Sequence, residues 1–186
     1  MLPLGTIECW VKKKESMKYK RVWARNYPIE TRCFIFSITS MMMIVGLSDG
    51  SLEVFRLIQK PRYVYYEMPR MVTAHSNDVV GIHLDELNQI IYSASEDGWI
   101  TVTDADRCLI INKHECESQI TCLHADPANR RLFVALDEGN IEIHEYIDKG
   151  GLKYLYSLCP PVECSMTTML FDSDKNYLFS SCYDSG

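Results

Sequence analysis

Four residues whose types can support nucleophilic catalysis lie close together in the sequence: His75, Ser93, Ser95 and Asp97. In serine hydrolases a serine hydroxyl gives its proton to a histidine, and an aspartate orients that histidine. Such a reaction also needs hydrogen-bond donors for the oxyanion of its intermediate, and nothing in the sequence indicates them. The four residues therefore do not predict a hydrolase by themselves, and the elements that carry them decide what they do.

Two pairs of residues are candidates for binding a metal: His114 with Cys116, and Cys159 with Cys164. Their spacing fits no common zinc pattern, and none of the eight cysteines is part of a CxxC pair. Most of the cysteines lie in apolar runs, where a thiol behaves as a small hydrophobic side chain. We expect no metal and no other cofactor, and we expect reduced thiols of the kind that an intracellular protein carries.

The charge and hydropathy of the chain exclude several classes of partner. The 186 residues are 47% hydrophobic, which suits one globular domain with a core, and the net charge is −6. This charge argues against a non-specific nucleic-acid binder, and no apolar run approaches the roughly 20 residues of a transmembrane helix. Lys12–Lys14 lie in the one basic cluster. We favour a solvated hairpin loop that protects an edge strand, and the alternative is a contact with phosphates.

A tight-turn signal recurs along the chain at near-equal intervals. It is clearest at Asp97–Gly98, and it returns at Asp49–Gly50, at Glu138–Gly139 and, weakened, at Asp184–Ser185. The intervals are 48, 41 and 46 residues (97 − 49, 138 − 97 and 184 − 138). At the same distance before each turn a short apolar-rich run begins, at Thr31, Val79, Ile120 and Met166. A period of about 40–45 residues is typical of the blades of a β-propeller.

Alternating apolar residues between the turns predict short strands and no helix. The strands are expected near 31–37, 41–47, 51–57 and 62–68; near 79–84, 89–95, 98–103 and 107–113; and near 119–124, 131–136, 140–146 and 152–158. We thus expect an all-β chain, residues 1–186, in which 31–68, 79–113 and 119–158 form full blades.

The two ends of the chain each predict part of a blade. Residues 5–24 have the pattern of the end of a blade, and residues 166–186 have the pattern of the start of one. The chain therefore holds about four blades' worth of strands. It is either part of a larger propeller, which we favour, or a ring closed by its own ends or by a second copy. Open blade edges would also favour self-association.

The stretch Ala74–Asp104, AHSNDVVGIHLDELNQIIYSASEDGWITVTD, resembles a WD40 repeat. It has a histidine before the first strand and an Asp-Gly turn before the third, but Thr103 stands where the family has tryptophan. The whole chain is similar to WD40-repeat propellers in order and spacing, and Trp10 is the one place where the signature tryptophan is present. The resemblance implies an all-β propeller with no catalytic site of its own.

The resemblance also gives the four residues of the opening paragraph a role. In WD40 repeats the histidine bonds the aspartate of the turn and a serine or threonine of the second strand. It implies that His75, Ser93, Ser95 and Asp97 form a structural hydrogen-bond network rather than a catalytic one. The other repeats lack the histidine, since the matching positions are Tyr27, Cys116 and Val162.

The fold that the resemblance implies gathers two sets of residues at the rim of one face. One set precedes each turn aspartate, and the other precedes each first strand. The eight rim residues are Glu30, Ser48, Asp78, Glu96, Gln119, Asp137, Ser165 and Tyr183. Because four of the eight are acidic, the rim predicts a basic peptide or a basic protein surface as partner. The alternative is an ordinary solvated acidic surface.

Taken together, these patterns predict a non-catalytic, cytoplasmic scaffold that presents propeller loops to other proteins. The runs ECWVKKKESMKYKRVW, RCFIF and IVGLSDGSLEVF resemble the first blades of proteins that combine WD repeats with a FYVE domain, a family associated with early endosomes. Phosphoinositide binding in that family is carried by the FYVE zinc module with its paired CxxC motifs, and this sequence contains none. The alternative function is therefore an endosomal membrane-traffic adaptor, recruited by a lipid-binding module absent from this chain.

Overall fold

The computed structural model describes residues 4–12, 18–60, 63–160 and 164–183. Within these residues the chain forms seventeen strands, and the remaining regular structure is one short 3-10 helix at Asp148–Gly150. The chain divides into two compact units, residues 1–31 and residues 32–186. Each unit is described by itself.

The first unit is an antiparallel hairpin of β1 (Gly5–Lys12) and β2 (Tyr19–Tyr27). The pairing shifts by one residue between Cys9 and Trp10, as at a β-bulge. The Trp10 side chain is 53% exposed, and its indole N–H donates to Glu8, which also pairs with Arg21 at 2.7 Å. The tryptophan thus lies on an open surface. Lys13 and Lys14 of the predicted basic cluster lie outside the described residues.

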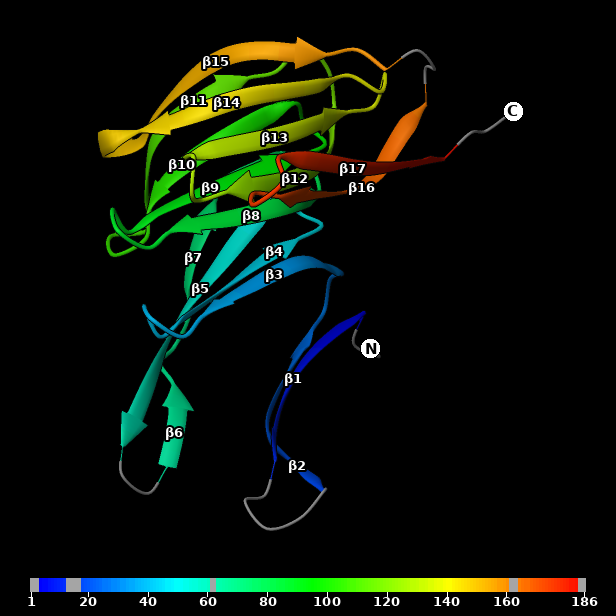
Figure 1. Cartoon of the computed structure of the whole chain (residues 1–186). Coiled ribbons are helices and arrows are strands. Elements are labelled where there is room, and N and C mark those ends of the chain that lie inside the picture. Colours follow the sequence, from blue (N-terminus) through cyan, green and yellow to red (C-terminus); the bar gives the residue numbers. More distant parts are fainter. Residues whose placement is uncertain (1–3, 13–17, 61–62, 161–163, 184–186) are drawn as a thin grey trace. The chain divides into compact units, whose positions relative to one another are not determined.

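The second unit contains three successive antiparallel sheets and a hairpin, which we call the first, second and third blades and the last hairpin (Figure 1). The first blade contains β3 (Thr31–Ser37), β4 (Met42–Leu47), β5 (Ser51–Lys60), β6 (Tyr63–Tyr66) and β7 (Arg70–Thr73). The second contains β8 (Val79–Asp85), β9 (Ile90–Ser95), β10 (Trp99–Asp104) and β11 (Leu109–Glu115). The third contains β12 (Ile120–Asp126), β13 (Arg131–Leu136), β14 (Ile141–Ile147) and β15 (Gly151–Leu158). The last hairpin pairs β16 (Ser165–Asp172) with β17 (Tyr177–Tyr183).

The blades stack face to face, and the first strands of the second blade, the third blade and the last hairpin each contact a strand of the preceding blade. β4 contacts β8, β8 contacts β12, and β12 contacts β16. Gly81 allows the closest approach, because a Cβ there would lie 2.4 Å from the Cβ of Leu123. In Figure 1 the green second blade and the third blade, which runs from yellow-green at β12 to orange at β15, accordingly lie against each other. The strands of consecutive blades therefore fan from a shared inner edge.

Each interface between blades holds its own apolar core. Ile44, Leu52, Val72, Val79 and Ile91 are buried between the first and second blades. The core between the second and third blades contains buried residues from both sheets: Tyr92, Ile100, Val102, Ile120, Leu132, Val134 and Tyr146. A third core joins the third blade to the last hairpin: Phe133, Ile141, Ile143, Met166 and Met169. The central strands β4 and β9 are buried along their whole length, which explains their continuous apolar character.

The three complete turn signals form the tight turns that the sequence predicts. Gly50, Gly98 and Gly139 have φ angles of 81°, 82° and 92°. Their N–H groups donate to the carbonyls of Leu47, Ser95 and Leu136. A left-handed residue at this position suits glycine, which explains the Asp-Gly and Glu-Gly pairs. The fourth signal, Asp184–Ser185, lies outside the described residues.

A second set of turns repeats at the same intervals. One residue with positive φ occurs in each hairpin between the first and second strands of a blade, at Met41, Gln89, Arg130 and Asn176. Their intervals are 48, 41 and 46 residues (89 − 41, 130 − 89 and 176 − 130), which equal the intervals between the turn signals. A capping side chain begins each of these hairpins and accepts backbone N–H bonds, at Ser37, Asp85, Asp126 and Asp172. The last hairpin therefore starts a fourth repeat of the same unit.

The outer part of the first blade differs from the sequence-based expectation. One outer strand was expected near 62–68, but the ten-residue β5 has two partners. β7 pairs with its first half at residues 51–54, and β6 pairs with its second half at residues 57–60. The range 31–68 therefore stops short of the strand that completes this sheet. The pattern of apolar residues missed this arrangement because β6 and β7 are each only four residues long.

Candidate functional site

The structure brings His75, Ser93 and Asp97 together at one end of the second blade. The Nδ1 atom of His75 lies 3.2 Å from a carboxylate oxygen of Asp97, and its Nε2 atom lies 2.8 Å from the Ser93 hydroxyl. Asp97 also accepts hydrogen bonds from the backbone N–H groups of Ser76 and Trp99. These bonds tie the loop before β8 to strand β9 and to the turn before β10.

Ser95 completes the set of four residues, on the same strand as Ser93. Its hydroxyl donates to the carbonyl of Asn77 and accepts the N–H of Asp97. It therefore joins the loop before β8 to the turn, although it does not contact the histidine directly. The structure thus places all four predicted residues in one connected group.

The protonation of the group follows from its burial. Burial lowers the pKa of His75, whose side chain is completely shielded from solvent, so the ring is neutral at pH 7. Burial also acts to raise the pKa of Asp97, but the hydrogen bonds from Ser76 and Trp99, together with the nearby His75, lower it overall. A neutral histidine thus donates from Nδ1 to a carboxylate and accepts from Ser93 at Nε2. Because Ser93 is 0% exposed, a substrate has no access to its hydroxyl.

Six of the predicted rim residues lie at this same end of the strands, in three backbone-linked pairs. The N–H of Glu96 donates to the carbonyl of Asp78, and the N–H of Asp137 donates to the carbonyl of Gln119. Ser165 and Tyr183 are paired across β16 and β17. Ser48 precedes the corresponding turn of the first blade, whereas Glu30 belongs to the first unit. Repeated pairing of this kind fixes the rim backbone in the second blade, the third blade and the last hairpin.

The charges of the rim are compensated unevenly. The guanidinium of Arg32 lies 2.8 Å from the carboxylate of Asp78 and 3.7 Å from that of Glu96. In contrast, one carboxylate oxygen of Asp137 is buried without a hydrogen-bond partner. Sequence reasoning missed Arg32 because it lies on β3 of the neighbouring blade, far along the chain from both acids. Among the described residues, Arg32 therefore offsets one of the two negative charges at the second blade, and no ion pair offsets that of Asp137 at the third.

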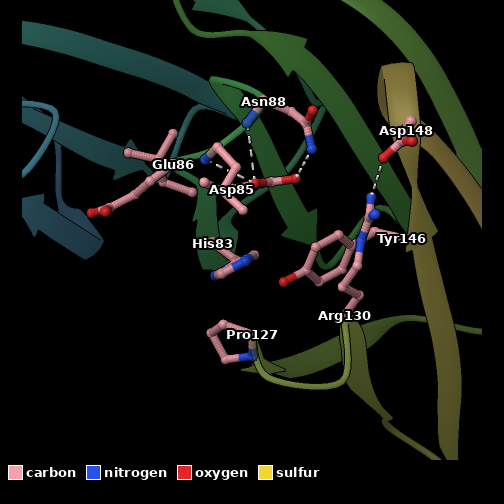
Figure 2. A pocket seen from close by; sticks show the side chains of 10 residues that line it. His83, Asp85, Glu86, Asn88, Pro127, Arg130, Tyr146 and Asp148 are labelled. Carbon is pink, nitrogen blue, oxygen red and sulfur yellow. Dashed lines mark hydrogen bonds and ion pairs between the residues drawn. The ribbon is translucent and has the colours of Figure 1, made fainter.

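A pocket of about 510 Å³ lies at the opposite end of β8, between the second and third blades (Figure 2). Its walls are the hairpin after β8, with Asp85, Glu86 and Asn88, and the residues of the third blade that Figure 2 labels: Pro127, Arg130, Tyr146 and Asp148. Most of its polar groups already have partners. Asp85 caps its own turn through Leu87 and Asn88, and Arg130 pairs with Asp148 at 2.8 Å.

His83 forms the aromatic part of this pocket together with two tyrosines. Its ring centroid lies 5.4 Å from that of Tyr146 and 6.3 Å from that of Tyr92. Burial lowers the pKa of His83 to about 4, and its Nε2 atom has no hydrogen-bond partner. No motif in the sequence indicates this pocket, because its residues come from two repeats.

Comparisons with known proteins support the fold. No family model and no curated protein matches the chain. Among solved structures 642 chains match, which indicates a widespread architecture rather than one function. One is a chain of the crystal structure of the mitotic checkpoint complex, with a TM-score of 0.69 and 14% sequence identity. The match covers 87% of this chain and 49% of that chain, so the present chain spans about half of its length.

The stacked antiparallel sheets, the repeated turns and this likeness together define the class: the chain has the fold of a WD40-type β-propeller, as its sequence predicts. At 14% identity the likeness concerns the fold alone. Propellers of this class are typically non-catalytic and recognise other proteins. Among the residues that the structure describes, no helix has the length and apolar character needed to cross a bilayer.

Proposed function

We propose that this chain is a non-catalytic interaction scaffold whose rim binds a basic peptide or a basic surface of a partner protein. The observation that carries the proposal is the position of Arg32, whose guanidinium lies 2.8 Å from the carboxylate of Asp78 and 3.7 Å from that of Glu96. These two rim carboxylates can thus hold a guanidinium, and together they carry more negative charge than Arg32 offsets. A lysine or arginine side chain of a ligand would add a charge-assisted hydrogen bond to this acidic set.

The surroundings of Asp137 support the same proposal. Its backbone is held by the bond to Gln119 and by the turn at Gly139, so the carboxylate is presented from a rigid base. Asp78 and Glu96 lie at the equivalent place in the second blade, where Arg32 bridges them. The guanidinium of a ligand can take the place of Arg32 between these two carboxylates. Surface ion pairs of this kind contribute only about 0–1 kcal/mol to stability, so their loss costs the folded chain little.

Catalysis by the His75 group is not part of this proposal. Among the hydrogen bonds described above, His75 contacts one hydroxyl group, that of Ser93. This hydroxyl is fully buried. The group connects a loop, a strand and a turn, which is what a rigid scaffold needs. Recruitment to endosomes depends on a module outside this chain and stays a prediction, as does self-association through blade edges.

The test compares two variants of equal net charge. The rim variant carries Asp78→Asn, Glu96→Gln and Asp137→Asn. The control variant carries Glu86→Gln, Asp106→Asn and Asp174→Asn, three exposed acids in the hairpins at the other end of the strands. Binding of fluorescein-labelled Lys/Arg-rich peptides is measured by anisotropy at low and physiological salt.

We expect the rim variant to weaken binding at least tenfold and the control variant to change it less than threefold. Equal losses in both variants would reduce the effect to net charge and would overturn the proposal. A loss confined to the control variant would also overturn it, and would place binding near the pocket of Figure 2.

A further inference from the structure

Two pairs of metal-binding residue types face each other where the second blade meets the third. His114 lies at the end of β11 and Cys116 follows two residues later. Glu142 and His144 lie two residues apart on β14, so both side chains are on one face of that strand. Ligand atoms of Cys116, Glu142 and His144 all lie within 4.8 Å of one another. The ring of His114 is 4.8 Å from the ring of His144, centroid to centroid.

The cluster is buried and only partly satisfied by its own hydrogen bonds. Glu142 accepts a bond from the His144 Nε2 atom at 2.7 Å and another from the backbone N–H of Glu117 at 3.1 Å. His144 is 0% exposed, yet its Nδ1 atom has no partner. An unpaired polar atom in such a place costs about 1–3 kcal/mol. The bond to Glu117 accounts for the carboxylate of Glu142, whereas the unpaired Nδ1 atom of the buried His144 is left without an explanation from packing.

We propose that Cys116, Glu142 and His144 form a binding site for Zn²⁺, with His114 as the fourth ligand. Thiolate, imidazole and carboxylate are the ligands that zinc takes in proteins, usually four in a tetrahedron. The charges balance, since one thiolate and one carboxylate neutralise a divalent cation while both histidines stay neutral. Binding breaks the S–H bond of Cys116 and releases that proton to solvent.

Binding requires the side chains to move closer together. Zn–S and Zn–N distances of about 2.3 and 2.0–2.1 Å place tetrahedral ligand atoms roughly 3.5 Å apart. The ligand atoms of Cys116, Glu142 and His144, now up to 4.8 Å apart, would approach that value when the Cys116 and His144 side chains rotate, and the ring of His114 would have to turn toward them. The sequence-based expectation of no metal rested on the spacing within His114–Cys116 and Cys159–Cys164 and on the lack of CxxC pairs. It did not consider Glu142 and His144, which lie in the next repeat.

The site would serve as a clamp between blades. His114 and Cys116 belong to the end of the second blade and the connection that follows it, whereas Glu142 and His144 belong to the third blade. One metal ion would therefore fix the outer edge of the second blade to the centre of the third. The expected consequence is a rise in the melting temperature when zinc is bound.

The experiment uses the full chain, freed of metal with a chelator and then dialysed. Co²⁺ is added as a spectroscopic substitute, followed by displacement with Zn²⁺. We expect one equivalent to give the visible bands of tetrahedral cobalt together with a near-ultraviolet thiolate charge-transfer band. Melting curves are recorded with and without one equivalent of Zn²⁺.

Two variants and one control separate the outcomes. Cys116→Ser should abolish the charge-transfer band, and His114→Asn, at a half-buried position, should weaken zinc binding at least tenfold with the fold retained. Cys159→Ser, an exposed cysteine elsewhere, should leave both signals unchanged. The proposal is overturned if the unsubstituted chain gives no charge-transfer band, if Cys159→Ser removes the band, or if His114→Asn binds zinc with unchanged affinity.

Discussion

The second and third blades have the same strands and turns, but they provide different hydrogen-bond acceptors for the same backbone N–H group. Ser76 of the second blade and Glu117 of the third occupy equivalent positions, 41 residues apart (117 − 76). The N–H of Ser76 donates to Asp97, in the turn before β10, whereas the N–H of Glu117 donates to Glu142, on β14. The fold therefore requires a carboxylate for this N–H, and two different strand positions can supply it.

This difference explains why the third blade tolerates the loss of the signature residues. Its counterparts of His75, Ser93 and Asp97 are Cys116, Val134 and Glu138, which cannot make the same network. Glu142 instead gathers bonds from Glu117 and His144. The carboxylate that accepts the backbone bond lies in the turn in the second blade and on strand β14 in the third. Its position on β14 places Glu142 beside His144, among the ligands proposed above.

Asp97→Ala should have the largest effect on stability. It leaves His75 and the N–H groups of Ser76 and Trp99 without their acceptor, so we expect a loss of about 3 kcal/mol in the free energy of unfolding. The equivalent change in the third blade, Glu138→Ala, removes an exposed side chain and should cost less than about 0.5 kcal/mol. Urea denaturation of both variants measures the contrast, and equal losses would show that the network does not stabilise the second blade.

Glu142→Ala should have the next largest effect, in metal-free protein. It leaves the N–H of Glu117 and the ring of His144 unpaired, and about 2 kcal/mol should be lost. At the equivalent position of the second blade, Thr101→Val removes one bond to the carbonyl of Ala74 and should cost about 1 kcal/mol. The same denaturation assay compares them. A larger loss from Thr101→Val than from Glu142→Ala would show that Glu142 is not the polar centre of the third blade.

His83 and His124 occupy equivalent positions in the second and third blades. Both should lower the free energy of unfolding in acid. Burial lowers the pKa of both, to about 4 for His83, while Asp85 acts to raise it and His124 to lower it further. The unfolded chain takes up protons below pH 6.5 and folded His83 only near pH 4. The stabilisation is therefore complete above pH 6.5 and falls by about 3 kcal/mol as the pH drops toward 4.

The contribution of each histidine can be separated by substitution. His83→Asn should remove most of this pH-dependence between pH 6.5 and 4. His124→Asn should remove less of it, although protonation of His124 also breaks the bond that its Nε2 atom accepts from the N–H of Phe171. Denaturation midpoints measured across this range provide the test. A slope unchanged in His83→Asn would contradict a neutral, buried ring.

Thr103→Val should stabilise the second blade. Thr103 stands where the family has tryptophan, and its hydroxyl is fully buried without a hydrogen-bond partner. A methyl group of the same shape removes the cost of the unsatisfied hydroxyl, so we expect a gain of about 1 kcal/mol. Thermal melting at pH 7.5 detects the change. A destabilised variant would show that the hydroxyl has a role in the folded state.

Arg32→Ala should have the smallest effect on stability. Its ion pairs with Asp78 and Glu96 are partly exposed, and such pairs contribute about 0–1 kcal/mol. The substitution should nevertheless tighten the binding of basic peptides, because it frees two rim carboxylates. Anisotropy titrations and a denaturation curve measure both effects on one variant. Weaker peptide binding would indicate that Arg32 contacts the partner itself.

The sequence predicts the repeat well and its polar centres less well. The Asp-Gly turns mark positions that need a left-handed residue, so Gly50, Gly98 and Gly139 could be located from residue type alone. His75 and Asp97 could be joined through the resemblance to a known repeat. Glu142 and His144 could not, because strand alternation does not distinguish a polar pair in a sheet from a surface pair. Arg32 and the pocket at His83 depend on neighbouring blades, which no pattern within one repeat can reveal.

The long strand β5 has a consequence for how this protein tolerates change. Its first half is held by β7 within the blade, while its second half continues with β6 as a separate two-stranded ribbon. Loop length adds little to the free-energy cost of closing a chain, so this ribbon can be shortened or extended with small effect on the packed interior. A chain in which β6 and the second half of β5 are shortened or extended should thus still fold, so this ribbon is a place where the protein tolerates insertions.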